Sequence, residues 1–468
     1  MPLPTVSEKT AASRRTFLGA TSALAVGAMA SNVAANETTP APAVHPAGSD
    51  EIRVALVGCG GRGAGAAADA LSVPQANVKL HAIADIFQQQ IDNKRKGLTN
   101  QFKEKVDVTD DRCFVGMEAY KQAVDCLRPG IDIAVFATPP AFRAAHFAYA
   151  IEKGVHVFME KPVSIDGPST KRILALADQA DAKNLKVGVG LMCRHSVARR
   201  ELFDRLQNGE AGELLTFYGY REHGPVMPMD LYPGPPEGMS ELFWQCKRFH
   251  NFIWASGGVF SDFYVHHIDE VCWMKNAWPV KAEAVGGRHF QGKVNDQNFD
   301  SYGVEWTFAD GAKFFYSGRT MKDCEQKFGV FGQGSKGAFT ISERGHSPAK
   351  STIYKSPSMD KDNILWTAAQ PEKSPYRIEW EDLVAAVLGN TPYNEAKRGA
   401  EASLVTAMGR FAAHTGKTVT FQEMLDCPDD LTAGVATLTD SSPAILVADA
   451  DGKYPVPMPG QFTFEYRS

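Results

Sequence analysis

The sequence lacks a basic stripe, a paired-cysteine motif and a long apolar run, and each absence argues against one class of protein. A formal net charge of −5 over 468 residues gives no sign of a nucleic-acid partner. The eight cysteines are scattered without a C-x-x-C pair, so neither a zinc site nor a disulfide framework is indicated, and we expect no metal. The apolar run at residues 18–30 is too short for a stable membrane span.

The N-terminus has the regions of an export signal. Arg14 and Arg15 precede the short apolar run, which ends in an A-x-A pattern at Ala28–Ala30. This predicts a twin-arginine (Tat) signal peptide at residues 1–30, followed by a disordered linker at 31–49. We therefore expect the Tat export machinery as a partner and a periplasmic or otherwise exported protein. The alternative is a disordered tail that happens to contain two arginines.

A glycine-rich turn follows the first apolar segment of the chain. Val54 to Val57 are typical of a strand buried on both faces, and glycines 58, 60 and 63 precede a helix beginning near Ala64. Glycines in such a turn allow a tight bend, backbone contact with a pyrophosphate and close packing of the helix. A second strand ends at Asp85, about 20 residues further on, where a ribose-binding carboxylate is expected. The pattern predicts a dinucleotide site and favours NAD over NADP; a purely structural turn is the alternative.

Strands and helices continue to alternate after this point. The apolar strand at 131–137 stops at Thr138-Pro139, and a helix at 141–153 leads to a short strand that ends before Glu160-Lys161. Such alternation predicts a parallel sheet with ligands at the carboxyl ends of its strands. Lys161 at that edge could stabilise a substrate alkoxide, although a solvated surface lysine is the alternative.

The composition changes after the first domain. From about residue 214 strands follow one another with few helices between them, which is typical of an antiparallel sheet. We predict the fold class α/β, with three parts: a Rossmann domain (doubly wound parallel sheet) at 50–190, an α+β domain with a mostly antiparallel open sheet at 191–425, and a C-terminal extension at 426–468. Residues 223–256 form a long aromatic-rich insertion, which we interpret as a substrate-covering loop.

One apolar segment carries a polar stripe. Asp262, His266 and Asp269 stand at i, i+4 and i+7 of a predicted helix. Because buried charges need partners, the spacing suggests that Asp262 orients the imidazole of His266, and histidine is a natural acceptor for an alcohol proton. The alternative is a structural histidine beside a surface aspartate, and His267 on another face is interpreted as structural.

Taken together, G-C-G-G-R-G, Asp85, A-T-P-P, M-E-K-P-V-S and G-G-V-F-S-D-F-Y-V-H-H-I-D resemble the Gfo/Idh/MocA family of sugar and polyol oxidoreductases over roughly residues 50–425. The resemblance implies that Lys161, His266 and Asp262 are the catalytic residues. Tyr264 replaces a glycine common in the family, which should narrow or reshape the pocket.

The motifs and the resemblance together give two sets of binding residues. The residues expected to bind the cofactor are Gly58, Gly60, Gly61, Arg62, Gly63, Asp85, Thr138, Pro139, His146, Glu160 and Lys161. The residues expected to contact the substrate are Arg194, His195, Trp254, Asp262 and His266.

These observations predict an exported NAD-dependent oxidoreductase that acts on a sugar or sugar derivative. Free NAD is scarce outside the cytoplasm, so we expect the cofactor to stay bound and to be recycled within one catalytic cycle. The alternatives are an NAD-dependent glycoside hydrolase that works by oxidation, elimination and reduction, and a non-catalytic nucleotide- or sugar-binding protein. The expected ligand is a small carbohydrate, and we expect a homo-oligomer.

Overall fold

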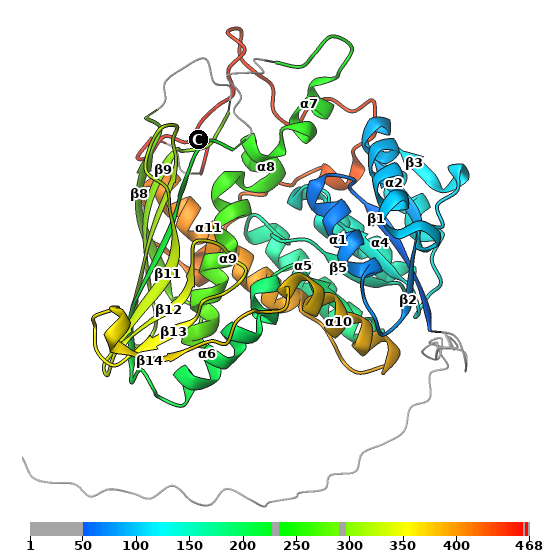
Figure 1. The fold of residues 1–468 in the computed structure, drawn as a ribbon. Coiled ribbons are helices and arrows are strands. Elements are labelled where there is room, and N and C mark those ends of the chain that lie inside the picture. Colours follow the sequence, from blue (N-terminus) through cyan, green and yellow to red (C-terminus); the bar gives the residue numbers. More distant parts are fainter. Residues whose placement is uncertain (1–49, 227–233, 290–295, 462–463, 467–468) are drawn as a thin grey trace, which may run out of the picture. The chain divides into compact units, whose positions relative to one another are not determined.

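The structure is a computed structural model that describes residues 50–226, 234–289, 296–461 and 464–466. The predicted signal at 1–30 and linker at 31–49 lie outside these residues. Within the described part, the strands form one six-stranded and one nine-stranded sheet (Figure 1). None of the helices described is both long and apolar enough to cross a membrane.

The six-stranded sheet is parallel throughout and has the order β3-β2-β1-β4-β5-β6. Its strands are β1 (Glu51–Val57), β2 (Asn77–Asp85), β3 (Cys113–Val115), β4 (Ile133–Phe136), β5 (His156–Met159) and β6 (Val187–Val189). Val57 of β1 pairs with Ala84 of β2 and with Phe136 of β4, so the carboxyl ends of these strands meet at one edge. The predicted doubly wound parallel sheet is confirmed.

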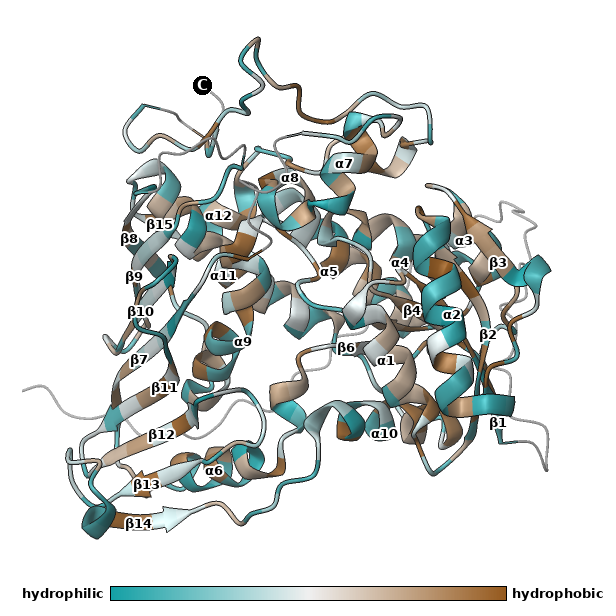
Figure 2. Cartoon of the chain, turned by 45° about the horizontal axis from the view of Figure 1, so that its top comes forward, coloured by the Kyte–Doolittle hydropathy of each residue, from teal (hydrophilic) through white to brown (hydrophobic). Residues whose placement is uncertain are grey.

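Helices connect these strands. They are α1 (Gly61–Leu71), α2 (Gln88–Phe102), α3 (Ala119–Asp125), α4 (Arg143–Glu152) and α5 (Gly167–Ala182). Helix α1 begins at Gly61 rather than near Ala64, so Gly61, Arg62 and Gly63 lie in its first turn. Helix α2 is polar along most of its length (Figure 2), and its buried residues are Ile91 and Leu98.

A helix from the far end of the sequence completes this layer. Helix α10 (Pro375–Leu388) packs on the six-stranded sheet, where the ring of Trp380 stacks on Phe158 with centroids 4.4 Å apart. Leu383 belongs to the same buried cluster as Leu56 of β1. The predicted domain at 50–190 did not include this helix, because the apolar pattern of a helix does not indicate which sheet it covers.

The nine-stranded sheet is mixed and mostly antiparallel, as predicted, with the order β14-β13-β12-β11-β7-β10-β9-β8-β15 and one parallel pair, β7 with β10. Its strands are β7 (Leu214–His223), β8 (Lys281–Gly287), β9 (Ser301–Thr307), β10 (Lys313–Thr320), β11 (Lys327–Gly334), β12 (Ala338–Glu343), β13 (Thr352–Tyr354), β14 (Ile364–Thr367) and β15 (Val419–Thr420).

Two long helices, α9 (Gly258–Lys275) and α11 (Ala396–Thr415), cover one face of this sheet (Figure 1). The shorter helices are α6 (Val197–Gln207) and α12 (Phe421–Asp426). Gly416, with a φ of 70°, ends α11 in the predicted C-cap position.

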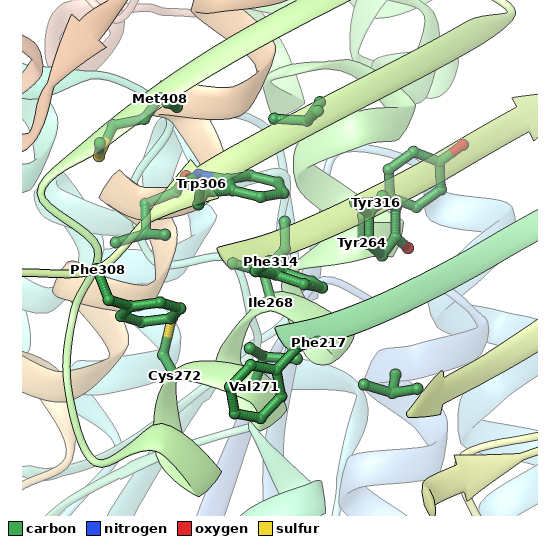
Figure 3. Close-up of a cluster of buried hydrophobic side chains, with 14 of the residues drawn as sticks. Phe217, Tyr264, Ile268, Val271, Cys272, Trp306, Phe308, Phe314, Tyr316 and Met408 are labelled. Atoms are coloured by element: carbon green, nitrogen blue, oxygen red, sulfur yellow. The ribbon is translucent and has the colours of Figure 1, made fainter. Parts of the chain in front are cut away.

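Tyr264 is part of the core between α9 and the sheet. Its ring packs with Tyr316 (Figure 3). It also packs with Phe260, and a Cβ on Gly318 would lie 2.4 Å from the Tyr264 ring. Because the side chain points into the sheet core, it does not itself narrow the pocket, and the expectation that it reshapes the pocket stays a prediction.

Large apolar side chains lie exposed on strands of the same sheet. Val285 is 75% exposed, Leu215 46% and Phe315 40%. Apolar surface of this kind suits an interface with a second copy of the chain, and the homo-oligomer stays a prediction.

The insertion at 223–256 is more regular than the loop we expected. Its described part contains α7 (Glu241–Lys247), the 3-10 turn η6 (Phe249–Asn251) and α8 (Ile253–Ser256). Helix α7 begins where the Ser240 hydroxyl accepts a hydrogen bond from the Phe243 amide. Trp244 and Trp254 are buried, so the segment is anchored by its aromatic residues.

Candidate active site

The turn after β1 has glycines where the backbone comes close to its neighbours. Gly58 has a φ of 94°, and a Cβ on it would lie 2.7 Å from the carbonyl carbon of Ala137. A Cβ on Gly63 would lie 1.9 Å from the Gly58 oxygen. Neither position has room for a side chain. A Cβ on Gly60 or Gly61 would meet nothing within 4 Å, so the N-terminus of α1 is open to an anionic group such as a pyrophosphate.

Asp85 ends β2 beside this turn. Its Oδ2 accepts a hydrogen bond from the Cys59 amide at 2.6 Å, and its Oδ1 accepts one from the Phe87 amide at 2.9 Å. Burial raises the pKa of the carboxyl, and these amides oppose that effect. The backbone thus fixes the carboxylate at the edge where a ribose hydroxyl is expected.

A cavity of about 400 Å³ joins these groups. It is lined by every residue predicted to bind the cofactor: Gly58, Gly60, Gly61, Arg62, Gly63, Asp85, Thr138, Pro139, His146, Glu160 and Lys161. The opposite wall comes from the insertion and α9, through Cys246, Lys247, Phe249, His250 and Asp262. The open glycines and the fixed carboxylate fit a dinucleotide, while the individual contacts stay predictions.

Two pairs of side chains in the cavity lining contact each other. The Nε of Arg62 donates to Glu160 Oε1 at 2.7 Å, which holds the guanidinium across the glycine turn. The Nδ1 of His146 lies 3.2 Å from the Thr138 hydroxyl. Burial, reinforced by the charge of Arg143, lowers the pKa of His146 to about 3, so this imidazole is neutral at pH 7.

Lys161 and Asp262 meet at the cavity wall. The Nζ of Lys161 donates to the backbone oxygen of Asp262 at 2.6 Å and lies 3.2 Å from its Oδ1. The Oδ2 of Asp262 lies 2.8 Å from the Nε2 of His250. Burial alone would raise the pKa of Asp262, but Lys161 and His250 outweigh it and hold that pKa well below its usual range. The carboxylate is therefore ionised and bridges two cationic or proton-binding groups.

His266 lies one turn further along α9 in a different environment. Its ring lies 4.6 Å from that of His346, and its Nδ1 has no hydrogen-bond partner among the described residues. Burial, and then the charges of His346 and Lys161, lower the pKa of His266 well below its usual range. The predicted contact between Asp262 and His266 is not the one that forms, because the Asp262 carboxylate is bound to Lys161 and His250.

The remaining predicted substrate contacts lie in packing networks outside the cavity lining. Arg194 binds Asp269 through Nε at 2.8 Å and through a terminal nitrogen at 2.7 Å. His195 lies between Asp382, at 2.8 Å, and Glu395, at 3.2 Å. The indole of Trp254 donates to the side chain of Gln245 at 2.9 Å. None of these three side chains lines the cavity, and their contact with a substrate stays a prediction.

One group of side chains whose types can bind metals lies next to His266. Cys193, Glu270 and His346 each place a ligand atom within 4.8 Å of the others. Glu270 is also 3.0 Å from Arg199, and both side chains are fully buried. The guanidinium therefore already balances the carboxylate charge.

Sequence reasoning missed two contributors to the cavity wall. His250 was overlooked because a single histidine in an aromatic-rich insertion has no spacing signal. The C-terminal extension was also given no function, yet the Asp440 carboxylate accepts a hydrogen bond from the Met117 amide at 2.7 Å, and Met117 lines the cavity. The same extension accepts a hydrogen bond from Gln245 at the oxygen of Leu446.

Comparisons with known proteins agree with this geometry. Residues 52–190 match the family GFO_IDH_MocA, described as an oxidoreductase family with an NAD-binding Rossmann fold. Inositol 2-dehydrogenase of Corynebacterium glutamicum is 25% identical over 169 residues, 36% of this chain and 42% of that protein. Alpha-N-acetylgalactosaminidase of Shewanella oneidensis is 25% identical over 215 residues, 42% of this chain and 45% of that protein. The chain thus spans less than half the length of these curated relatives.

The solved structure of scyllo-inositol dehydrogenase from Lactobacillus casei, with bound NAD(H) and scyllo-inositol, shares the fold. The TM-score is 0.58 at 20% identity, and the match covers 80% of this chain and 99% of that one.

Proposed function

We propose that the protein is an NAD-dependent oxidoreductase acting on a CH–OH group of a sugar or sugar derivative, because residues 52–190 match the Gfo/Idh/MocA oxidoreductase family. The observation that carries the proposal is the contact between Lys161 and Asp262. Both residues line the same cavity as the glycine turn. Bound NAD⁺ would supply the hydride acceptor. Lys161 would stabilise the oxyanion that develops on the substrate, and the ionised Asp262 holds the ammonium group in place.

The experiment that tests this function uses purified protein saturated with NAD⁺ and a panel of sugars and cyclitols. At least one compound is expected to produce the absorbance of reduced nicotinamide on the enzyme. Thermal-shift binding of a sugar without any hydride transfer, measured with deuterium-labelled substrate, would instead identify a non-catalytic binding protein.

We propose further that the cofactor is retained and recycled. The hydrogen bond that the Met117 amide donates to the Asp440 carboxylate supports this, because it braces one wall of the cavity. Purified protein is expected to carry bound nucleotide, and Asp440→Asn is expected to release it about tenfold faster, since a hydrogen bond to a charged acceptor contributes about 1.5–3 kcal/mol. The measurement is the rate of nucleotide loss on dilution. Asp451→Asn, an exposed change in the same extension, is the control, and equal release rates for the two variants would contradict the proposal.

Export by the twin-arginine route remains part of the proposal. Arg14, Arg15 and the A-x-A pattern support it. N-terminal sequencing of the mature protein from the periplasm or culture medium is expected to begin at Ser31. Replacing both arginines with lysine is expected to retain the precursor in the cytoplasm. Export of the doubly substituted chain at the normal level would rule out this route.

Glycoside hydrolysis is the second candidate. The match to alpha-N-acetylgalactosaminidase, at the same identity as the match to inositol 2-dehydrogenase, favours it as an alternative. The two functions separate in one assay, because hydrolysis by transient oxidation releases a free sugar from a glycoside without net formation of NADH.

A further inference from the structure

One arginine of the nine-stranded sheet has no carboxylate partner. Arg221 lies on β7 beside Gly318 of β10, and a Cβ on Gly318 would meet the Tyr264 ring of α9. Because neighbours in register share a face of a sheet, the side chain of Arg221 extends from the face that α9 covers. Its guanidinium forms no ion pair with any carboxylate of the described residues, and its buried Nε has no hydrogen-bond partner among them.

The contacts that Arg221 does make fix its position without supplying a negative charge. Its Nη1 donates to the Nε2 of His346 at 2.8 Å. Burial lowers the pKa of His346 to about 4, so this imidazole is neutral at pH 7. The guanidinium carbon lies 5.1 Å from the centre of the Phe263 ring and 5.3 Å from that of Phe328. Aromatic faces attract a cation, but they carry no full charge that could balance it.

The carboxylates nearest in the fold are matched to other groups. Glu222, the next residue on β7, lies 3.3 Å from Arg319. Glu270 lies 3.0 Å from Arg199. Asp262 is already bound on both of its oxygens, as described above. The positive charge on β7 is therefore left over after the neighbouring carboxylates have been paired, and an anion that is not part of the chain can balance it.

The ring of Phe263 connects this arginine to the cofactor cavity. The Nζ of Lys161 lies 6.0 Å from the centre of the ring, and Arg221 contacts the same ring. The imidazoles of His223 and His250 lie 5.8 Å and 5.5 Å from it. Phe263 is only partly buried. Apolar surface with a few polar groups around it is the usual composition of a site for a small ligand.

We propose that the substrate is an acidic sugar, whose carboxylate or phosphate group binds to Arg221 while its reacting hydroxyl lies at Lys161. The assignment rests on the proposed oxidoreductase function. A guanidinium presents its N–H groups as a planar fork, which matches two oxygens of a carboxylate or a phosphate. The bound anion balances the charge of Arg221, and Phe263 provides apolar surface for the sugar ring between the two cations.

The test measures binding to matched pairs of sugars, with purified protein saturated with NAD⁺ in a buffer without phosphate. Glucuronate and glucose 6-phosphate are each compared with glucose, and galacturonate is compared with galactose, by calorimetric titration. The parent protein is expected to bind at least one acidic sugar about tenfold more tightly than its neutral counterpart, because hydrogen bonds to charged groups are the strong ones. The carboxylate and phosphate arms show which anion the site accepts.

Arg221→Gln is expected to remove this preference, because an amide carries no charge. Arg221→Lys keeps the charge without the fork and is expected to retain only part of the preference. The matched control is Arg344→Gln, since the side chain of Arg344 is 85% exposed and lies 3.6 Å from Glu343. This control is expected to distinguish the sugars as the parent protein does. The melting temperature of each variant without a sugar checks that it is folded.

The outcomes separate this inference from the proposed function. Equal affinities of the parent protein for both members of every pair would overturn the inference, and NADH formed from a neutral sugar would then leave the oxidoreductase function intact. A preference for acidic sugars that persists in Arg221→Gln would overturn the role of Arg221. Binding of an acidic sugar that depends on Arg221, without any hydride transfer, would support the anion site and overturn the oxidoreductase function.

Discussion

Lys161→Met is expected to lower kcat by about 10²–10³-fold, as the loss of one preorganised donor to a developing oxyanion typically does. The change keeps most of the side-chain volume and removes the ammonium group that lies 3.2 Å from Asp262 Oδ1. Nucleotide binding is expected to persist, because the glycine turn and Asp85 belong to other elements of the first domain. The measurement is steady-state turnover together with the nucleotide content of the purified variant.

Lys171→Met is the matched control. Lys171 pairs with Asp426 at 2.6 Å, and both side chains are about half exposed. The variant is expected to turn over like the parent protein, since exposed ion pairs contribute little. Equal activity of the Lys161 and Lys171 variants would contradict the role given to Lys161.

Glu465→Ala is expected to lower the free energy of unfolding by about 3–5 kcal/mol, because it leaves a buried arginine without its counter-charge. The Nε of Arg410 donates to Glu465 Oε1 at 2.6 Å, and His414 lies 2.8 Å from the same oxygen. Both Arg410 and Glu465 are almost completely buried. Burial alone would raise the pKa of Glu465, but Arg410 and His414 hold it at about 2.

Urea unfolding followed by circular dichroism measures this change. The double variant Arg410→Met with Glu465→Leu is the informative comparison, because removing both charges leaves neither one unpaired. It is expected to recover most of the lost stability. A Glu465→Ala protein within about 1 kcal/mol of the parent would show that the pair does not hold the extension in place.

The sequence revealed those parts of the fold that local patterns encode. β1 and β4 were found from continuous apolar runs, because strands buried on both faces have no polar alternation. The association of α10 with the first sheet could not be found in this way. Its contact between Trp380 and Phe158 joins segments that are far apart in the chain, and no local pattern records such a pairing.

The candidate site could likewise be predicted from the sequence only in part. The predicted cofactor residues follow strands of one parallel sheet, so the geometry of the sheet alone brings them to a common edge. The spacing of Asp262 and His266 correctly placed both on α9, but helical spacing gives only nearness along one face. Asp262 instead contacts His250, which tertiary packing brings close to it from the insertion.

The brace between Asp440 and Met117 also has a consequence for biosynthesis. The two residues are separated by 323 positions, so the ribosome completes the six strands of the first sheet long before it makes the carboxylate that steadies the cavity wall. On the proposed retention of the cofactor, a chain shortened to end before Asp440 is expected to exchange nucleotide freely, and addition of the last segment is expected to slow that exchange.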